Sequence, residues 1–248
     1  INKENSIKRK ISSLKSFFKY FYNSGKINEN ILSKVLLPKL VEKDIIRLDI
    51  DEVALMIDEI ENGDSLSKKQ KQYHEKTKKR DLAIVGLMLG TGIRVSECVG
   101  LNLNDIDLKN DGIRVHRKGG KEVTVYFSDE LESLLLSYLA ERKHMETAKG
   151  HEEALFISLQ MKRISVRSVE KLVKKYAKAV APLKKITPHK LRSTYGTNLY
   201  RETGDIYLVA DVLGHSDVNT TKKHYAALED DRRKKARNAV KLREDNIS

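Results

Sequence analysis

The chain has 248 residues, with 48 Lys or Arg against 35 Asp or Glu, and a formal net charge of +13 at pH 7. Its length suits one large domain or two unequal ones, and its basic surplus makes nucleic acid the leading partner. The longest apolar run, residues 82–89, is too short to span a bilayer, and the single cysteine excludes an intramolecular disulfide. We therefore expect a protein of the reducing cytoplasm.

Residues 6–24 show the period of an amphipathic helix, which Gly25 is expected to end. The side of this helix that is expected to pack carries Ile7, Ile11, Leu14, Phe17, Phe18 and Phe21. Basic residues lie elsewhere on the helix, and the candidate DNA contacts among them are Lys8, Arg9 and Lys15. Residues 26–40 indicate a turn and a short helix that ends at Pro38, and residues 41–48 indicate a linker.

The next stretch predicts a helix from Asp49 or Asp51 through Ile60, whose inward residues would be Val53, Leu55, Met56, Ile57 and Ile60. Residues 61–80 are polar and contain seven Lys or Arg. They are typical of a solvated loop or helix extension, with phosphate contact as the second interpretation. Residues 81–89 indicate a buried helix, followed by a turn at Gly90 and Gly92. Arg94 then begins a helix among apolar neighbours, and an arginine in such surroundings more often has a functional role.

Two stretches that alternate apolar and polar residues, 113–117 and 122–127, predict a β-hairpin with Gly119 and Gly120 as a two-residue turn. Lys118 lies at the lip of that turn. Helices are predicted over residues 131–139 and from Ser165 through Val180, with a short extended piece at 155–158. The second helix has a basic face, and its candidate DNA contacts are Arg167, Lys171 and Lys174.

Residues 187–226 contain the residue types of a phosphodiester-handling site. Thr187 can cap a helix whose first position is Pro188. His189 and Arg192 then fall three residues apart on one face, near an N-terminus whose dipole attracts anions.

The second half of this stretch contributes a further histidine and a tyrosine. Gly204 is expected to end the first helix, and a short helix follows up to Leu213, after which His215 emerges. Ser216 or Asp217 can cap a last helix that carries Tyr225. Because the stretch pairs a tyrosine with cationic residues and lacks acidic metal ligands, it indicates a nucleophile that attacks phosphorus.

The same stretch resembles the catalytic box of the tyrosine recombinases, the phage integrase and Xer family, whose pattern is H-x-x-R, then L-G-H, then the nucleophilic tyrosine. PHKLR, LGHSDVNTT and HYA stand in that order here. Upstream, GTGIRVSECVGLNLNDIDL resembles the segment with the family's first catalytic arginine, and HRKGGKEV resembles its hairpin with the catalytic lysine. Two departures are Ser193, where a second histidine is common, and Tyr225, which follows His215 by ten residues where nine is more usual.

The resemblance implies a mainly α fold with a small antiparallel sheet, in which a tyrosine-recombinase catalytic domain follows a helical core-binding remnant. It implies that residues 1–42 are the last part of a DNA-clamping domain that is N-terminally truncated here. Residues 43–228 would form the catalytic domain, and residues 229–248 a helix that docks on a neighbouring protomer. The alternatives are that the first helix belongs to the catalytic domain and that the tail is frayed.

The catalytic set that the resemblance implies is Arg94, Lys118, His189, Arg192, His215 and the nucleophile Tyr225. No metal or other cofactor is expected. The implied partner is double-stranded DNA with specific recombination sites, bound by a homo-tetramer that is monomeric when free. Accessory DNA-bending proteins are further candidate partners, a membrane is not expected, and the implied location is the cytoplasm, at the nucleoid.

The expected function is site-specific recombination through a 3′-phosphotyrosine intermediate and a Holliday junction. The polar stretch 61–80 and the ten-residue spacing favour the integrase of a mobile element. The alternatives are an Xer-type chromosome dimer resolvase, a type IB topoisomerase and a catalytically inert DNA-binding regulator. A zinc protein is disfavoured, because C-x-x-C and H-x-x-x-H spacings do not occur in the sequence.

Overall fold

The computed structural model describes residues 4–38, 46–117, 119–215 and 218. It divides the chain into two compact units, Ile1–Asp44 and Ile45–Ser248. The expected boundary after residue 42 and most of the linker at 41–48 fall in residues that the structure does not describe, as do the expected boundary after residue 228 and the tail 229–248.

The first unit is built on α1 (Glu4–Asn23), which agrees with the helix predicted over residues 6–24. Gly25 ends it with a φ of 70°, and the Lys26 amide donates to the Phe21 carbonyl at 3.0 Å. The prediction that one apolar face packs is wrong for Ile7, Leu14 and Phe17, which are 39%, 51% and 57% exposed. This part of the helix is only partly covered within the unit. The Phe17 ring lies against Phe21 of the same helix, with ring centroids 4.6 Å apart and the ring planes tilted by 48°.

The short helix predicted within residues 26–40 is not formed over the described residues 26–38, which adopt bends and a turn at 31–34. The Ser33 amide donates to the Asn30 carbonyl, and the Val35 amide donates to the Leu32 carbonyl. Leu36 is 88% exposed, so the segment buries little of its apolar surface. A short helix without a packed face does not offset the entropy of its first turn.

The second unit is mainly helical, and it also contains a three-stranded antiparallel sheet among its described residues, in the order β1-β2-β3. This confirms the predicted fold class. Its elements in chain order are α2 (Ile50–Asn62), α3 (Lys68–His74), α4 (Lys78–Thr91), α5 (Val95–Gly100), a 3-10 turn at Leu103–Asp105, β1 (Ile106–Asp107), β2 (Gly112–His116), β3 (Glu122–Tyr126), α6 (Asp129–Arg142), α7 (Val166–Val180), α8 (Pro188–Thr203) and α9 (Ile206–Val212).

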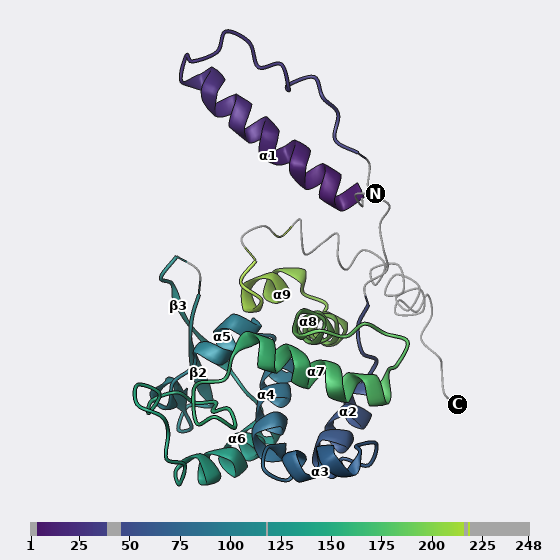
Figure 1. The fold of residues 1–248 in the computed structure, drawn as a ribbon, viewed down its shortest axis with the longest axis vertical. Coiled ribbons are helices and arrows are strands. Elements are labelled where there is room, and N and C mark those ends of the chain that lie inside the picture. The colour runs from purple at the N-terminus through teal and green to yellow at the C-terminus, as the bar shows by residue number, and fades with distance from the viewer. Residues whose placement is uncertain (1–3, 39–45, 118, 216–217, 219–248) are drawn as a thin grey trace, which may run out of the picture. The chain divides into compact units, whose positions relative to one another are not determined.

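Helix α4 is the centre of this unit, and it contacts α2, α6, α7 and α8 (Figure 1). Its apolar residues lie on all sides of the helix, as expected of an element that is buried all round. Those that are fully buried are Ala83, Ile84, Val85, Leu87 and Met88. The helix runs on through Gly90 and ends at Gly92, so the predicted turn begins two residues later than expected.

Two predictions for residues 49–80 need correction. Leu55 was expected to face inward but is 52% exposed. It projects away from the buried stripe through Val53, Met56 and Ile60, because 100° per residue puts it on the other side of α2. The stretch 61–80 was expected to be a solvated connection, but part of it folds and packs. It forms α3 and buries His74, whose Nε2 lies 2.7 Å from the Ile60 carbonyl oxygen.

The β-hairpin has the predicted strands but a longer loop. Ile113 pairs with Val125 and His116 pairs with Glu122. The Arg117 amide donates to the Lys121 carbonyl at 2.7 Å, which encloses residues 118–120 rather than the two glycines alone. Gly119 and Gly120 have φ values of 83° and 75°, so both use the left-handed region that glycine allows.

A buried carboxylate joins α4 to α7. Asp81 is 2% exposed, and its Oδ1 accepts from Nη2 of Arg80 at 2.7 Å. Its Oδ2 accepts from the Tyr176 hydroxyl at 3.1 Å and the Thr77 hydroxyl at 3.2 Å. Burial, with the Asp81 charge in second place, raises the pKa of the Tyr176 phenol. This keeps Tyr176 in its neutral, donating form.

We predict that Asp81→Asn lowers the free energy of unfolding by about 3 kcal/mol, because it leaves Arg80 beside a neutral amide inside the protein. Urea denaturation followed by circular dichroism measures the loss. Asp64→Asn is the matched control on an exposed residue, and its effect should stay within about 0.5 kcal/mol. Equal stabilities of the two variants would contradict this account of α4 and α7.

Candidate active site

The chain delivers Arg94 at the N-cap of α5, just after the turn that ends α4. The Glu97 carboxylate accepts from the Arg94 amide at 2.8 Å and from Arg94 Nη1 at 2.7 Å. The Glu97 side chain is 5% exposed, whereas that of Arg94 is 41% exposed. A buried carboxylate thus orients a guanidinium group that still faces solvent.

Gly92 sets the turn before Arg94, with a φ of 65°. A Cβ atom there would lie 2.4 Å from Cδ1 of Tyr195 and 2.9 Å from Cδ2 of Leu213. Helix α8 and the end of α9 therefore pack directly on this turn. Burial raises the pKa of the Tyr195 phenol, so that it packs as a neutral aromatic side chain.

Arg192 lies beneath the site and not on its surface. It is 4% exposed, in the second turn of α8, and its Nη1 donates to the Gly92 carbonyl at 2.5 Å. Its Nη2 donates to the Leu213 carbonyl in a very short hydrogen bond. Because Gly92 precedes Arg94 by two residues and Leu213 precedes His215 by two, Arg192 fastens together the two segments that carry these side chains.

The turn after α9 presents His215. Asp205 caps α9, since its Oδ1 accepts from the amides of Tyr207 and Leu208. At the other end, the Gly214 amide donates to the Asp211 carbonyl at 2.7 Å and the His215 amide to the Ala210 carbonyl at 2.9 Å. Gly214 adopts a φ of 59°, which completes a left-handed helix end.

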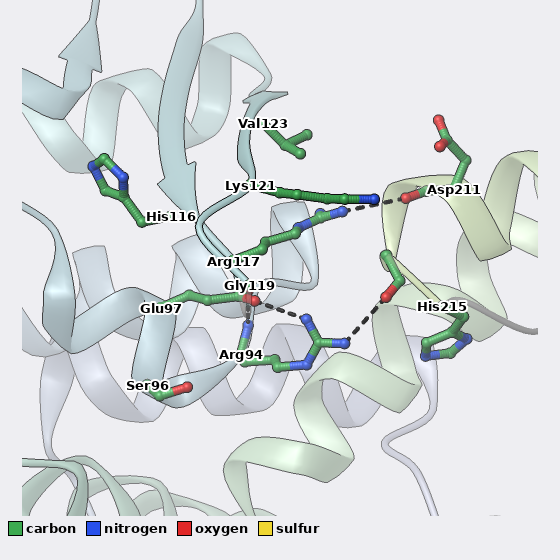
Figure 2. Close-up of a pocket in the computed structure, with 11 residues that line it drawn as sticks. Arg94, Ser96, Glu97, His116, Arg117, Gly119, Lys121, Val123, Asp211 and His215 are labelled. Carbon is green, nitrogen blue, oxygen red and sulfur yellow. Dashed lines mark hydrogen bonds and ion pairs between the residues drawn. The ribbon is translucent and has the colours of Figure 1, made fainter.

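Arg94 and His215 line one open pocket of about 1110 Å³. The hairpin supplies another wall, through His116, Arg117, Gly119 and Lys121 (Figure 2). Arg94 Nη2 donates across the pocket to the Gly214 carbonyl at 3.2 Å. A pocket that collects guanidinium groups and a histidine is suited to an anion such as a phosphate.

Arg117 is a pocket residue that the sequence did not single out. Its Nη2 donates to the Val212 carbonyl at 2.7 Å, and its Nη1 lies at the longer distance of 3.5 Å from the Asp211 carbonyl oxygen. Arg94, Arg117 and Arg192 thus all donate to carbonyls of residues 211–214, and we call this arrangement the arginine clasp. The motif around the adjacent Lys118 points to this loop, but the contact between Arg117 and Val212 has no local signal in the sequence.

The remaining predicted catalytic residues are His189, Lys118 and Tyr225. His189 is exposed in the first turn of α8, one helical turn before Arg192. Ser193, which stands where the resembled family commonly has histidine, donates from its hydroxyl to the His189 carbonyl at 3.0 Å. Lys118 and Tyr225 lie outside the described residues, as do Ser216 and Asp217, the predicted caps of the next helix.

The predicted DNA contacts fall on two helices. Arg167, Lys171 and Lys174 are exposed on α7, at spacings that put them on one side of the helix. On α1, Arg9 is exposed and Lys8 is partly buried. Lys15 donates from Nζ to the Ser33 carbonyl at 3.3 Å, so it also ties the helix to the turn that follows.

Within the described residues, the structure has no cluster of three or more His, Cys, Asp or Glu that could hold a metal ion. Over the same residues, we find no helix that is both long and apolar enough to cross a membrane. Cys98 is fully buried in the core, and burial raises the pKa of its thiol to about 12.

Sequence comparison gives a family and its members. The chain matches the phage integrase family over residues 47–232. It is 37% identical over 223 residues to tyrosine recombinase XerC of Thermodesulfovibrio yellowstonii, covering 88% of this chain and 69% of that protein. A XerC of Caldanaerobacter subterraneus is 38% identical, with 86% of this chain and 57% of that protein covered. This chain therefore spans only part of each relative's length.

Solved structures give the same result. The crystal structure of XerA recombinase superposes with a TM-score of 0.65 at 30% identity, covering 88% of this chain and 72% of that one. The Tn1549 transposon integrase in complex with circular intermediate DNA shares the fold at 22% identity, with a TM-score of 0.72, covering 94% of this chain and 79% of that one. Together these findings establish that the chain belongs to the phage integrase family of tyrosine-type site-specific recombinases.

Proposed function

We propose that this chain cuts and rejoins DNA at specific sites through a 3′-phosphotyrosine intermediate. The observation that carries the proposal is the convergence of Arg94, Arg192 and His215. Arg94 and His215 lie 121 positions apart in the sequence, yet both line one pocket, and Arg192 fastens their two segments from below. Such convergence is expected of a site that stabilises charge on a phosphate in the transition state.

In the proposed reaction, the hydroxyl oxygen of Tyr225 attacks the scissile phosphorus. A phosphorus–oxygen bond to the tyrosine forms while the bond to the 5′-oxygen breaks. His189 accepts the phenol proton, and Lys118 gives a proton to the departing 5′-oxygen. Arg94 and Arg192 bind the non-bridging oxygens, and His215 donates a hydrogen bond to them. The guanidinium groups thus supply charge stabilisation that other phosphoryl-transfer enzymes take from a metal ion.

The hydrogen bonds of Arg94 and Arg192 to carbonyls suggest how DNA engages the site. A guanidinium binds an anionic phosphate more strongly than a neutral carbonyl, and it binds it through two parallel hydrogen bonds. We infer that the scissile phosphate replaces or shares these carbonyl contacts, and that the 211–214 turn adjusts as it does so. His215 follows that turn directly, so its position would then depend on bound DNA.

The basic side of α7 and the residues of α1 would hold the duplex. Arg167, Lys171 and Lys174 are exposed, as phosphate contacts must be.

We further propose that residues 1–42 contribute to a DNA clamp, that residues 43–228 perform catalysis, and that residues 229–248 link the protomers of a homo-tetramer. The protein would be a monomer when it is not bound to DNA. Such a tetramer would exchange strands through a Holliday junction, in the cytoplasm at the nucleoid, and accessory DNA-bending proteins would assist it.

Two biological roles fit this chemistry. The polar stretch 61–80 and the ten-residue spacing from His215 to Tyr225 favour the integrase of a mobile element. The relatives named XerC favour the second candidate, a chromosome dimer resolvase. Sequencing the DNA that becomes covalently attached to the protein in cells decides between them. A chromosomal site near the replication terminus supports the resolvase, and the ends of a mobile element support the integrase.

We predict that Tyr225→Phe still binds DNA but forms no covalent complex, because it loses only the nucleophilic oxygen. Denaturing gels detect the adduct, and band shifts detect binding. Tyr126→Phe, which removes a hydroxyl from a 70% exposed tyrosine on β3, should leave both unchanged. If Tyr225→Phe formed the adduct as wild type does, Tyr225 would not be the nucleophile. The absence of an adduct in every protein, wild type included, would favour an inert regulator.

We predict that Arg192→Lys slows cleavage by about 100-fold to 1000-fold, the cost of one lost donor to a charged transition state. An ammonium group cannot replace the paired donors of a guanidinium group. Single-turnover cleavage of a radiolabelled site measures the rate. Arg201→Lys makes the same exchange at an exposed position on the same helix and should cleave normally, provided that melting curves show both variants folded.

We predict that DNA affinity falls steeply with salt, by about a thousandfold or more between 50 and 200 mM. Lys171→Gln should reduce the slope of log affinity against log salt by about one. Fluorescence anisotropy measures the slope, and Lys143→Gln, an exposed residue at the end of α6, serves as the control. If the two variants have the same slope, the α7 contact is wrong.

A further inference from the structure

Arg117 joins the hairpin to the end of α9 through its side chain as well as its backbone. Its amide donates to the Lys121 carbonyl and closes the hairpin loop. Its guanidinium crosses to a segment 95 residues later in the chain, where Nη2 donates to the Val212 carbonyl at 2.7 Å. Figure 2 shows this side chain extended from the loop toward the end of α9.

Gly214 provides an independent sign of the same contact. A Cβ atom at Gly214 would lie 2.3 Å from Nη1 of Arg117 and 2.8 Å from its Cζ. The guanidinium group therefore occupies the space that a side chain would take, directly against the turn that leads into His215. Gly214 needs to be a glycine here both for its φ of 59° and for this packing.

The chemistry of the contact suits arginine. The last carbonyls of a helix carry partial negative charge and have no partner within the helix. A planar guanidinium group can donate hydrogen bonds to two neighbouring carbonyls at once, which a single ammonium group cannot do in the same geometry. Arg114, on β2 three residues before Arg117, carries the same charge but pairs with Asp105 at 3.3 Å, away from α9.

We propose that Arg117 is a positioning residue, which aims Lys118 by tying the hairpin to the turn that presents His215. The inference rests on the proposed function, in which Lys118 protonates the departing 5′-oxygen. Arg117 immediately precedes Lys118 in the chain, so an anchored Arg117 would limit the positions that Lys118 can take when DNA is bound. In this proposal Arg117 keeps its carbonyl contacts when DNA binds, unlike Arg94 and Arg192, and it acts only through Lys118.

A substrate whose bridging 5′-oxygen is replaced by sulfur tests this directly. A thiol has a pKa of about 8.5, so a thiolate leaves without a proton from Lys118. Arg117→Ala should slow cleavage of the ordinary substrate by about tenfold to a hundredfold. This is part of the rate enhancement that general-acid catalysis contributes, because the variant keeps Lys118 but no longer positions it. On the sulfur substrate it should cleave at the wild-type rate, and Lys118→Ala should behave in the same way.

Three further variants complete the comparison. Arg114→Ala removes an equal charge from β2 of the same hairpin and should cleave both substrates normally. Arg192→Lys should be slow on both, because its defect lies at the non-bridging oxygens. Arg117→Lys should be intermediate on the ordinary substrate, because it keeps the charge and loses the planar contact. Melting curves establish that each variant is folded.

The outcomes separate this inference from the function on which it rests. If wild-type protein forms no covalent adduct, the proposed function itself fails. If wild type cleaves but Arg117→Ala stays slow on the sulfur substrate, Arg117 contacts the phosphate or serves the fold, and its positioning role is overturned. Wild-type cleavage of the ordinary substrate by Arg117→Ala overturns it as well.

Discussion

The bonds from Arg192 to the carbonyls of Gly92 and Leu213 are the constraint on which the site depends. A guanidinium group that is 4% exposed costs several kcal/mol to bury unless its donors are satisfied. The carbonyls at a glycine turn and at a helix end are suitable acceptors, because they lack partners within their own elements. The same bonds therefore bury the charge and bring the segments of Arg94 and His215 together.

The arginine clasp extends this arrangement to the pocket surface. Arg94 reaches Gly214 from α5, and Arg117 reaches Val212 from the hairpin. Several cations near one another repel, and here carbonyls with partial negative charge and the Glu97 carboxylate offset that repulsion. An anionic ligand would offset it further, which supports the proposal that the pocket binds a phosphate.

Family membership and local geometry answer different questions. The match over residues 47–232 and the relatives at 37% and 38% identity establish a tyrosine-type recombinase. The geometry adds how this chain builds its site: Gly92 allows Tyr195 and Leu213 to approach, and Gly214 leaves room for Arg117. These glycines make the site compact, because a side chain at either would separate the elements that the arginines join.

The sequence by itself determined the elements whose ends are set by neighbouring residues. Ser165 and Gly204 cap α7 and α8 as predicted, since caps act over three or four residues. Motif order also singled out Arg94, Arg192 and His215 as candidate site residues. Only the tertiary structure decided that Arg192 joins Gly92 to Leu213 and that Arg117 meets Val212. These contacts join residues far apart in the chain, which propensity and spacing do not encode.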